Sequence, residues 1–200
     1  MKKYLLVLLH PYILCVQFFI IAVIFASMIF PFQQEPEKCG VNRWGVKTLT
    51  DVDAKKVNFK SIKTSIDSLR SLKPDRKIGA TVPRFGAEFY TFQLNCGIRE
   101  YSNEEDGDIH LVLFDLKDTT KTFVAEIPDP NCPAVKGTKY APKFQKCRED
   151  FEAYKLPKKK VLKGEYKITG SFFFDKLHNV KGAPPFGGEI HPVLTIKKMK

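Results

Sequence analysis

The sequence lacks the short motifs that mark several common enzyme classes. Its 200 residues contain no G-x-S-x-G nucleophile elbow, no G-x-x-x-x-G-K-[ST] phosphate loop and no H-E-x-x-H zinc motif. A glycine-rich stretch at residues 182–188 does not follow the strand-then-helix pattern that a phosphate-binding loop requires. These absences argue against a serine hydrolase of the elbow type, a P-loop nucleotidase and a zinc protease.

Cysteines at C-x-x-C spacing are also missing, so a structural zinc site made of thiolates is not predicted. Cys15 lies in an apolar run, which leaves an even number of cysteines, as is typical of disulfide-bonded proteins in an oxidising compartment. Of the three possible pairings we favour Cys132–Cys147, which are close in sequence, together with Cys39–Cys96. The alternative is that these thiols are reduced and buried.

Charged residues are absent from residues 5–32, which follow the basic residues Lys2 and Lys3. The run is longer than the roughly 7–15 apolar residues of a signal-peptide core and reaches the roughly 20 needed to span a bilayer. We predict a single transmembrane anchor or signal segment over residues 1–32, with the N-terminus in the cytoplasm. A signal peptide cleaved near Ser27 is the alternative. In both cases the domain is exported to the cell envelope and is periplasmic or extracellular.

Basic residues are in excess, giving a formal net charge of +11, and many lie in short runs such as residues 158–160 and 197–200. Such a charge favours anionic partners, namely nucleic acid, a phospholipid surface or an acidic glycan. The alternative is a solvated lysine surface without a partner. The runs lack interleaved aromatic residues and arginine, so they are a weak signal for nucleic acid.

A strand pattern is clearest in residues 106–130. Apolar residues alternate through residues 109–114, and after a polar break the β pattern resumes at residues 122–127 and ends at Pro128 and Pro130. This predicts two strands joined by a tight turn. The residues before them, 87–101, alternate in the same way and predict the preceding strand.

The remaining chain completes a five-stranded pattern. Residues 140–154 have apolar residues at helical spacing, residues 161–175 predict a long strand bent at a central glycine, and residues 191–197 predict the last strand. Five strands with one helix between the third and fourth is the arrangement of the OB-fold. We therefore predict a mainly β, OB-like barrel over residues 87–200. The alternative is an open antiparallel sheet with the helix on one face.

Residues 33–86 are predicted to be a linker and N-terminal arm. We expect an extended segment at residues 44–51 that packs Trp44 on the domain, a helical turn at residues 51–57 and a short helix at residues 64–72 capped by Thr64.

Four phrases resemble those of a group of small bacterial exported proteins. They are D-G-D-I-H-L-V-L, A-E-I-P-D-P-N-C, I-T-G-S-F-F-F-D and E-I-H-P-V-L, and the likeness covers about residues 42–197. We know of no activity assigned to that group. The resemblance therefore implies a domain boundary after the apolar run and implies nothing about chemistry.

The histidines after the apolar run each have a carboxylate nearby in sequence. Asp108 and His110 are two residues apart, as are Glu189 and His191, so each pair projects from one face of a strand. Imidazole and carboxylate groups are suitable ligands for a divalent metal. No cofactor is predicted outright, but a divalent metal ion is compatible with a candidate set of Asp108, His110, Glu126, His178, Glu189 and His191. The alternative is that these histidines are structural or surface groups.

The Asp-Gly-Asp sequence at residues 106–108 resembles the Asp-Gly-Asp-Thr motif of thermonucleases, which are also OB-folds. The resemblance implies phosphodiester hydrolysis. Ile109 stands where that motif has threonine, and no arginine and glutamate set lies in a matching phrase. The alternative is a hairpin turn in which Gly107 adopts a positive φ.

The loop between the last two predicted strands is a second candidate site, because OB-folds grip ligands with this connection. Its candidate binding residues are Lys176, His178, Lys181 and Phe186. Two functions follow. We first predict an exported, membrane-anchored binding module for an anionic glycan, nucleic acid or protein, and hence a non-enzyme; the alternative is a metal-dependent hydrolase, for instance a nuclease. The hydrolase requires the histidines and carboxylates to converge on one cavity.

Overall fold

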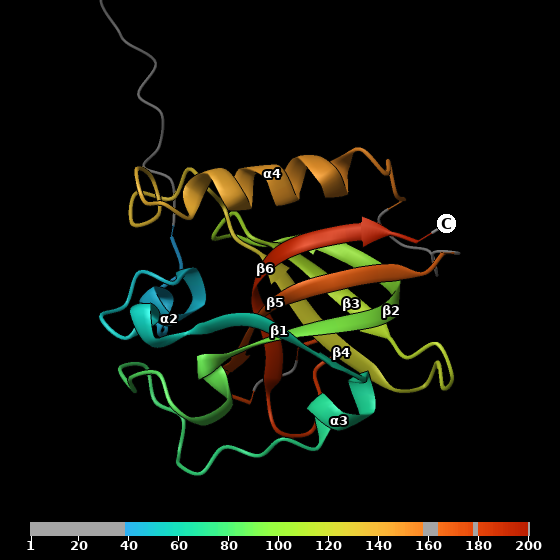
Figure 1. The fold of residues 1–200 in the computed structure, drawn as a ribbon, viewed down its shortest axis with the longest axis horizontal. Coiled ribbons are helices and arrows are strands. Elements are labelled where there is room, and N and C mark those ends of the chain that lie inside the picture. The colour runs from blue at the N-terminus through green and yellow to red at the C-terminus, as the bar shows by residue number, and fades with distance from the viewer. Residues whose placement is uncertain (1–38, 158–163, 178–179, 200) are drawn as a thin grey trace, which may run out of the picture. The chain divides into compact units, whose positions relative to one another are not determined.

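A computed structural model describes residues 39–157, 164–177 and 180–199, and residues 37–200 form one compact unit (Figure 1). The helices and strands are α2 (Trp44–Thr48), β1 (Asn58–Thr64), α3 (Ile66–Arg70), β2 (Tyr90–Asn103), β3 (Ile109–Phe114), β4 (Thr122–Ile127), α4 (Ala141–Glu152), β5 (Tyr166–Phe174) and β6 (Gly188–Lys198). Short 3₁₀ turns lie at Ala54–Lys56 and Gly86–Phe89. Within this part of the chain, no helix is long and apolar enough to cross a membrane. The predicted membrane segment, residues 158–160 and His178 lie outside the described residues.

Five strands close into a barrel. Antiparallel pairs join β2 to β3, β3 to β4, β6 to β5 and β5 back to β2, while β4 and β6 are parallel neighbours. Helix α4 lies between β4 and β5 in sequence. This closed, mixed, mainly β barrel is consistent with the predicted OB-like fold, and the open-sheet alternative is wrong.

The barrel closes because two of its strands bend. The first half of β2 pairs with β5 and the second half pairs with β3, so one strand takes part in both sides of the closure. In β5 the register with β6 shifts on both sides of Gly170. A Cβ atom at Gly170 would lie 2.3 Å from the carbonyl oxygen of Pro192. Only glycine allows this close approach of two strands, as predicted from the central glycine.

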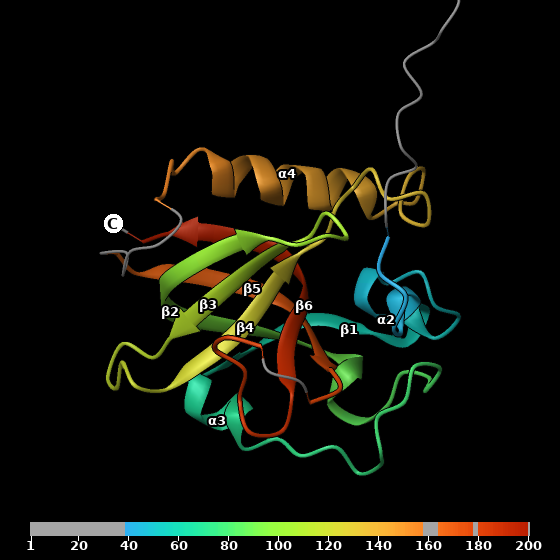
Figure 2. The same cartoon turned by 180° about the vertical axis from the view of Figure 1, so that it is seen from behind.

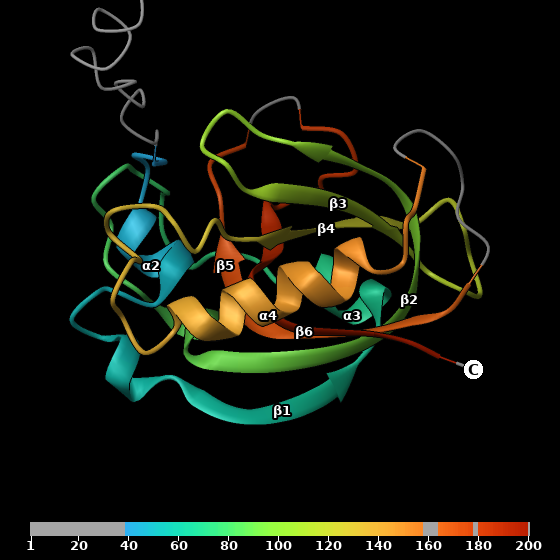
Figure 3. The ribbon, with the colours of Figure 1, turned by 90° about the horizontal axis from the view of Figure 1, so that it is seen from above.

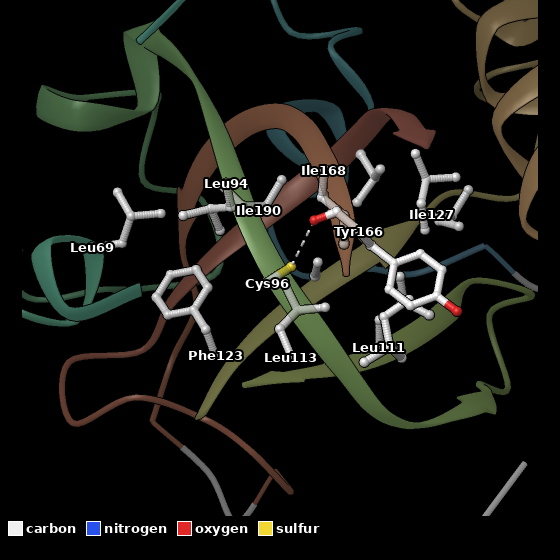
Figure 4. Packing of buried hydrophobic residues seen from close by; sticks show 14 of the residues in the cluster. Leu69, Leu94, Cys96, Leu111, Leu113, Phe123, Ile127, Tyr166, Ile168 and Ile190 are labelled. Carbon is white, nitrogen blue, oxygen red and sulfur yellow. Dashed lines mark hydrogen bonds between the residues drawn. The ribbon is translucent and has the colours of Figure 1, made fainter. Parts of the chain in front are cut away.

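The core fills the barrel interior. Strand alternation turns Leu111 and Leu113 of β3 inward, and they pack with Leu94, Phe123 and other fully buried side chains (Figure 4). Helix α4 lies against β6 beside the barrel (Figures 1 and 3) and adds Cys147 and Phe151 to the same cluster. The predicted helix and strands of this domain are therefore found within a few residues of their expected bounds.

The N-terminal arm differs from the sequence prediction. Residues 44–48 form helix α2 rather than an extended segment, because Arg43 and Leu49 adopt left-handed conformations that start and end one short helical turn. Strand β1 was not predicted, and it pairs in parallel with β2 as an added edge strand. The predicted short helix is present as α3, but Ser65 rather than Thr64 caps it. Figure 2 shows β1 and α2 from the opposite side.

Two buried arginines attach the arm to the barrel. Arg43 donates to both carboxylate oxygens of Glu88 and to the backbone oxygen of Phe174. Arg84 donates to Asp51 and to the backbone oxygen of Val46 within the arm, and to the backbone oxygen of Glu88 beyond it. The arm is thus held by charge-assisted hydrogen bonds rather than by apolar packing alone.

The predicted disulfide pairs are wrong. The structure joins Cys39 to Cys132, while Cys96 and Cys147 are free and buried. Cys96 lies inside the barrel with its Sγ atom 3.7 Å from the backbone oxygen of Tyr166, and Cys147 faces the core from α4. Proximity in sequence misled the prediction, because α4 turns Cys147 away from the loop that holds Cys132. The disulfide indicates an oxidising compartment outside the cytoplasm.

Replacing Cys39 and Cys132 together by serine is expected to lower the free energy of unfolding by about 2–4 kcal/mol, because the bond closes a long loop and restricts the unfolded chain. The two cysteines are 93 residues apart in sequence. Urea unfolding measures the change, and the wild-type protein unfolded under reducing conditions is the matched control. Equal stability of oxidised and reduced wild type would contradict the prediction.

Candidate functional site

A cleft of about 950 Å³ lies on the outer side of the barrel. Three segments line it: the turn between β2 and β3, the connection between β5 and β6, and residues 39–47 of the arm. In OB-folds the first two connections and the strands beside them hold ligands. The cleft therefore occupies the position at which domains of this architecture bind their partners.

A row of polar side chains crosses three strands, and two of its members, His110 and Glu126, line the cleft. His110 of β3 pairs in register with Glu126 of β4, and the parallel pairing of Ala125 with Ile190 places His191 of β6 next to Glu126. Alternation explains the row, since the apolar neighbours in these strands turn into the core. His110, Glu126 and His191 are all buried.

His110 is held from both sides of its ring. Its Nδ1 lies 2.9 Å from Oε1 of Glu126 and its Nε2 lies 3.2 Å from the backbone oxygen of Lys181. Both partners are acceptors, so only the doubly protonated ring donates to each. Burial lowers the pKa of His110. The hydrogen bond to Glu126 and the charge of Glu126 together raise it by a larger amount, so the net shift is upward.

His191 lies fully buried between carboxylates, next to the cleft residues Glu126 and Glu189. Its Nε2 is 3.1 Å from Oδ2 of Asp108, and its Nδ1 is 2.9 Å from Oε2 of Glu126 and 3.7 Å from Oε2 of Glu189. Burial lowers the pKa of His191, yet the negative charge of Glu126 and its neighbours raises it well above the ordinary value.

The three carboxylates around His191 differ in their affinity for protons. Burial raises the pKa of Asp108, and burial together with the charge of Glu126 raises the pKa of Glu189. Burial also acts to raise the pKa of Glu126, but the charge of His191 and the hydrogen bond from His110 lower it well below its usual range. Glu126 is thus the carboxyl group of the cluster that gives up its proton most readily.

Several buried polar atoms of this cluster lack hydrogen bonds. Within the described part of the chain, no hydrogen bond is formed by Nδ1 or Nε2 of His191, Oδ2 of Asp108 or Oε2 of Glu189. The atoms lie within ion-pair distance of one another, but they are not aligned for hydrogen bonds. Buried groups in this state usually have a further partner, either water or an ion.

A divalent cation fits this donor set. Asp108, Glu126 and His191 each offer one ligand atom, and these atoms lie within 4.8 Å of one another. Carboxylate oxygens together with an imidazole nitrogen are suitable ligands for zinc, manganese or iron. His110 and Glu189 lie beside these three residues and line the cleft.

The structure thus brings together five of the six residues predicted as metal ligands. The sixth, His178, lies outside the described residues. Of the residues predicted to bind ligand through the last loop, Lys176 and Lys181 line the cleft. Phe186 does not line it, and its ring lies under the ammonium group of Lys73 at 4.9 Å.

Two further residues in the cleft were not predicted from the sequence. Lys47 of α2 has its ammonium group 3.7 Å from Oδ2 of Asp175, and Trp44 packs edge-on against the ring of His191. Burial lowers the pKa of Lys47. The charges of Glu189, Glu126 and their neighbours together raise it by a larger amount, so the side chain stays charged. The only sign of these residues in the sequence is the single tryptophan, Trp44, with Lys47 after it at helical spacing.

The turn at residues 104–108 has the predicted hairpin character. Gly107 has a φ of 87°, and a Cβ atom there would lie 2.6 Å from Oδ2 of Asp129. The turn directs Asp108 to His191, while Asp106 lines the cleft and accepts a hydrogen bond from the backbone N–H of Asp108.

Comparison of the chain with known protein families, with curated proteins and with solved structures found no match.

Proposed function

We propose that this protein is a metal-dependent hydrolase whose divalent ion is held by Asp108, Glu126 and His191. One observation carries the proposal: three buried donors from three separate strands or turns lie within 4.8 Å of one another. Both ring nitrogens of the histidine among them lack a hydrogen bond within the described part of the chain. An ion would supply a partner for one of these nitrogens and offset the charge of the buried carboxylates.

The surroundings of the cluster fit hydrolysis. A metal ion in such a site lowers the pKa of a bound water and polarises the bond to be cleaved. Of the three proposed ligands Glu126 lines the cleft, and so do the neighbouring residues His110 and Glu189. These two residues are placed to take up or release a proton at a substrate in the cleft.

A binding module without catalysis is the second candidate. It is supported by the position of the cleft, which lies between the two connections that hold ligands in OB-folds, with Lys176 and Lys181 on its wall. The two candidates share the cleft and differ in turnover. Substrate hydrolysis that depends on metal separates them.

Metal analysis of the full-length protein tests the proposal. We expect about one divalent ion per chain after loading with zinc or manganese, and a chelator is expected to lower the melting temperature by about 5–10 °C, because ion binding at 100 times its dissociation constant stabilises the folded state by about 2.7 kcal/mol. Chromogenic phosphodiester and amide substrates then report turnover. Absence of both metal and chelator effect would overturn the metal site; metal without turnover would favour the binding module.

A further inference from the structure

A short segment before β6, residues 180–183, lies against the outer face of β3. The backbone oxygen of Lys181 is 3.2 Å from Nε2 of His110, and a Cβ atom at Gly182 would lie 2.6 Å from Cγ1 of Val112. His110 and Val112 are two residues apart on β3, so they share one face of the strand. Gly182 has a φ of 84°, which glycine adopts readily, and its missing side chain lets the segment approach the strand this closely.

This segment forms part of the wall of the cleft. Val180 and Lys181 line the cleft together with His110 and Glu126. The ammonium group of Lys181 also lies 2.6 Å from Oε1 of Glu100, but this lysine side chain is 74% exposed, and an exposed ion pair contributes little. The contact with the buried ring of His110 is therefore the polar contact that ties this wall to the interior of the site.

The other ring nitrogen of His110 reaches one of the proposed metal ligands. Nδ1 lies 2.9 Å from Oε1 of Glu126, while Oε2 of the same carboxylate lies 2.9 Å from Nδ1 of His191. One oxygen of Glu126 is thus held by His110, and the other remains for an ion. Hydrogen bonds to the ligands of a metal orient them, and their loss typically lowers metal affinity by about 10- to 100-fold.

From these contacts we infer that His110 is a positioning residue that couples ion binding to the wall of the cleft. The inference rests on the proposed function and adds a form of regulation to it. An ion on Glu126 fixes that carboxylate, the carboxylate fixes the ring of His110, and the ring fixes the backbone of Lys181. The ion thus acts on ligand binding as well as on turnover, because part of the surface that a ligand meets is held in place through His110.

The coupling has two further consequences. Linkage is reciprocal, so a segment in place on β3 raises the affinity for the ion by the same factor by which the ion stabilises the segment. In addition, Nε2 of His110 can exchange a proton with a substrate only after it leaves the oxygen of Lys181. The wall therefore also controls the proton-transfer role of this histidine.

Hydrogen exchange of the full-length protein, with and without saturating zinc, tests the coupling. The backbone N–H of Ala183 donates to the backbone oxygen of Val180 at 3.2 Å, so its exchange reports whether the segment keeps its place. We expect zinc to slow exchange in the peptide that spans residues 180–187 about fivefold, a typical coupling factor. Zinc affinity is measured on the same samples by competition with a chromogenic chelator.

Two variants divide the contacts of the ring. The shorter side chain of His110→Asn can still donate to Glu126 but does not reach Lys181, whereas the longer one of His110→Gln reaches Lys181 and gives up Glu126. We expect zinc to leave exchange of the segment unchanged in both variants. Zinc affinity is expected to fall at least about tenfold in His110→Gln. In His110→Asn it is expected to fall by no more than about fivefold, the factor that reciprocity sets.

The matched control is Glu165→Gln, which neutralises an exposed carboxylate just before β5 and is expected to behave as the wild type does. Equal slowing by zinc in the wild type and in His110→Asn would overturn the inference, as would wild-type zinc affinity in His110→Gln. A wild-type protein that binds zinc without slower exchange of the segment overturns this inference alone. A wild-type protein that binds no zinc overturns the proposed function with it.

Discussion

His191→Ala is expected to abolish stoichiometric binding of a divalent ion by the full-length protein. His191 supplies the only imidazole of the three-residue donor set, and it is fully buried between Asp108 and Glu126. Removal of one of three protein ligands leaves two carboxylates, which hold zinc or manganese weakly without a nitrogen donor. We expect at least a hundredfold loss of affinity, measured by competition with a chromogenic chelator.

Conservative variants show whether the loss of metal binding comes from the missing ligand or from unfolding of the protein. Asp108→Asn and Glu126→Gln keep the size of the side chains, and each is also expected to lower metal affinity by about 10- to 100-fold or more. Glu165→Gln, at an exposed position just before β5, is the matched control and is expected to bind metal normally. Wild-type metal content in a folded His191→Ala protein, verified by circular dichroism, would refute the proposed site.

Glu88→Gln is expected to lower the free energy of unfolding by about 3–5 kcal/mol, because the change leaves the buried guanidinium of Arg43 without its counter-charge. Glu88 accepts four hydrogen bonds: two from Arg43 and one each from the backbone N–H groups of Phe85 and Phe174. The glutamine has one acceptor oxygen, and its amide nitrogen would face donors. Urea unfolding of the full-length protein measures the loss.

Removal of both charges distinguishes the contribution of the ion pair to the free energy of unfolding from that of packing. The double variant Arg43→Met with Glu88→Gln is expected to recover part of the lost stability, because no unpaired buried charge remains. Glu149→Gln, which is exposed on α4, is expected to change stability by less than about 0.5 kcal/mol. A loss below about 1 kcal/mol for Glu88→Gln would show that the arm is held mainly by other contacts.

Prediction from sequence was most accurate where structure depends on neighbours along the chain. The alternation in residues 109–114 and 122–127 gave β3 and β4 with the correct bounds, and the apolar spacing of residues 140–154 gave α4 within a few residues. Hydrophobic periodicity specifies which face of an element is buried, so these elements follow from local pattern. The bend at Gly170 followed in the same way from a glycine within a strand.

Prediction failed where residues distant in sequence decide the structure. Strand β1 has mostly exposed side chains and exists because its backbone pairs with β2, so no burial pattern marked it. Helix α2 starts after Arg43, whose guanidinium is held by Glu88, 45 residues further along the chain. The disulfide likewise joins two segments that only the folded arm brings together.

Local pattern was enough to predict the barrel strands, the helix between β4 and β5, and the residue types of the candidate site, because periodicity and side-chain chemistry are local properties. Local pattern could not predict that Asp108, Glu126 and His191 meet. Their meeting depends on the parallel register of β4 with β6 and on the turn at Gly107, which bring three separate segments to one point. The set of charged residues that shares the cleft was equally hidden, since the sequence gives no sign of which carboxylates and lysines meet in one cavity.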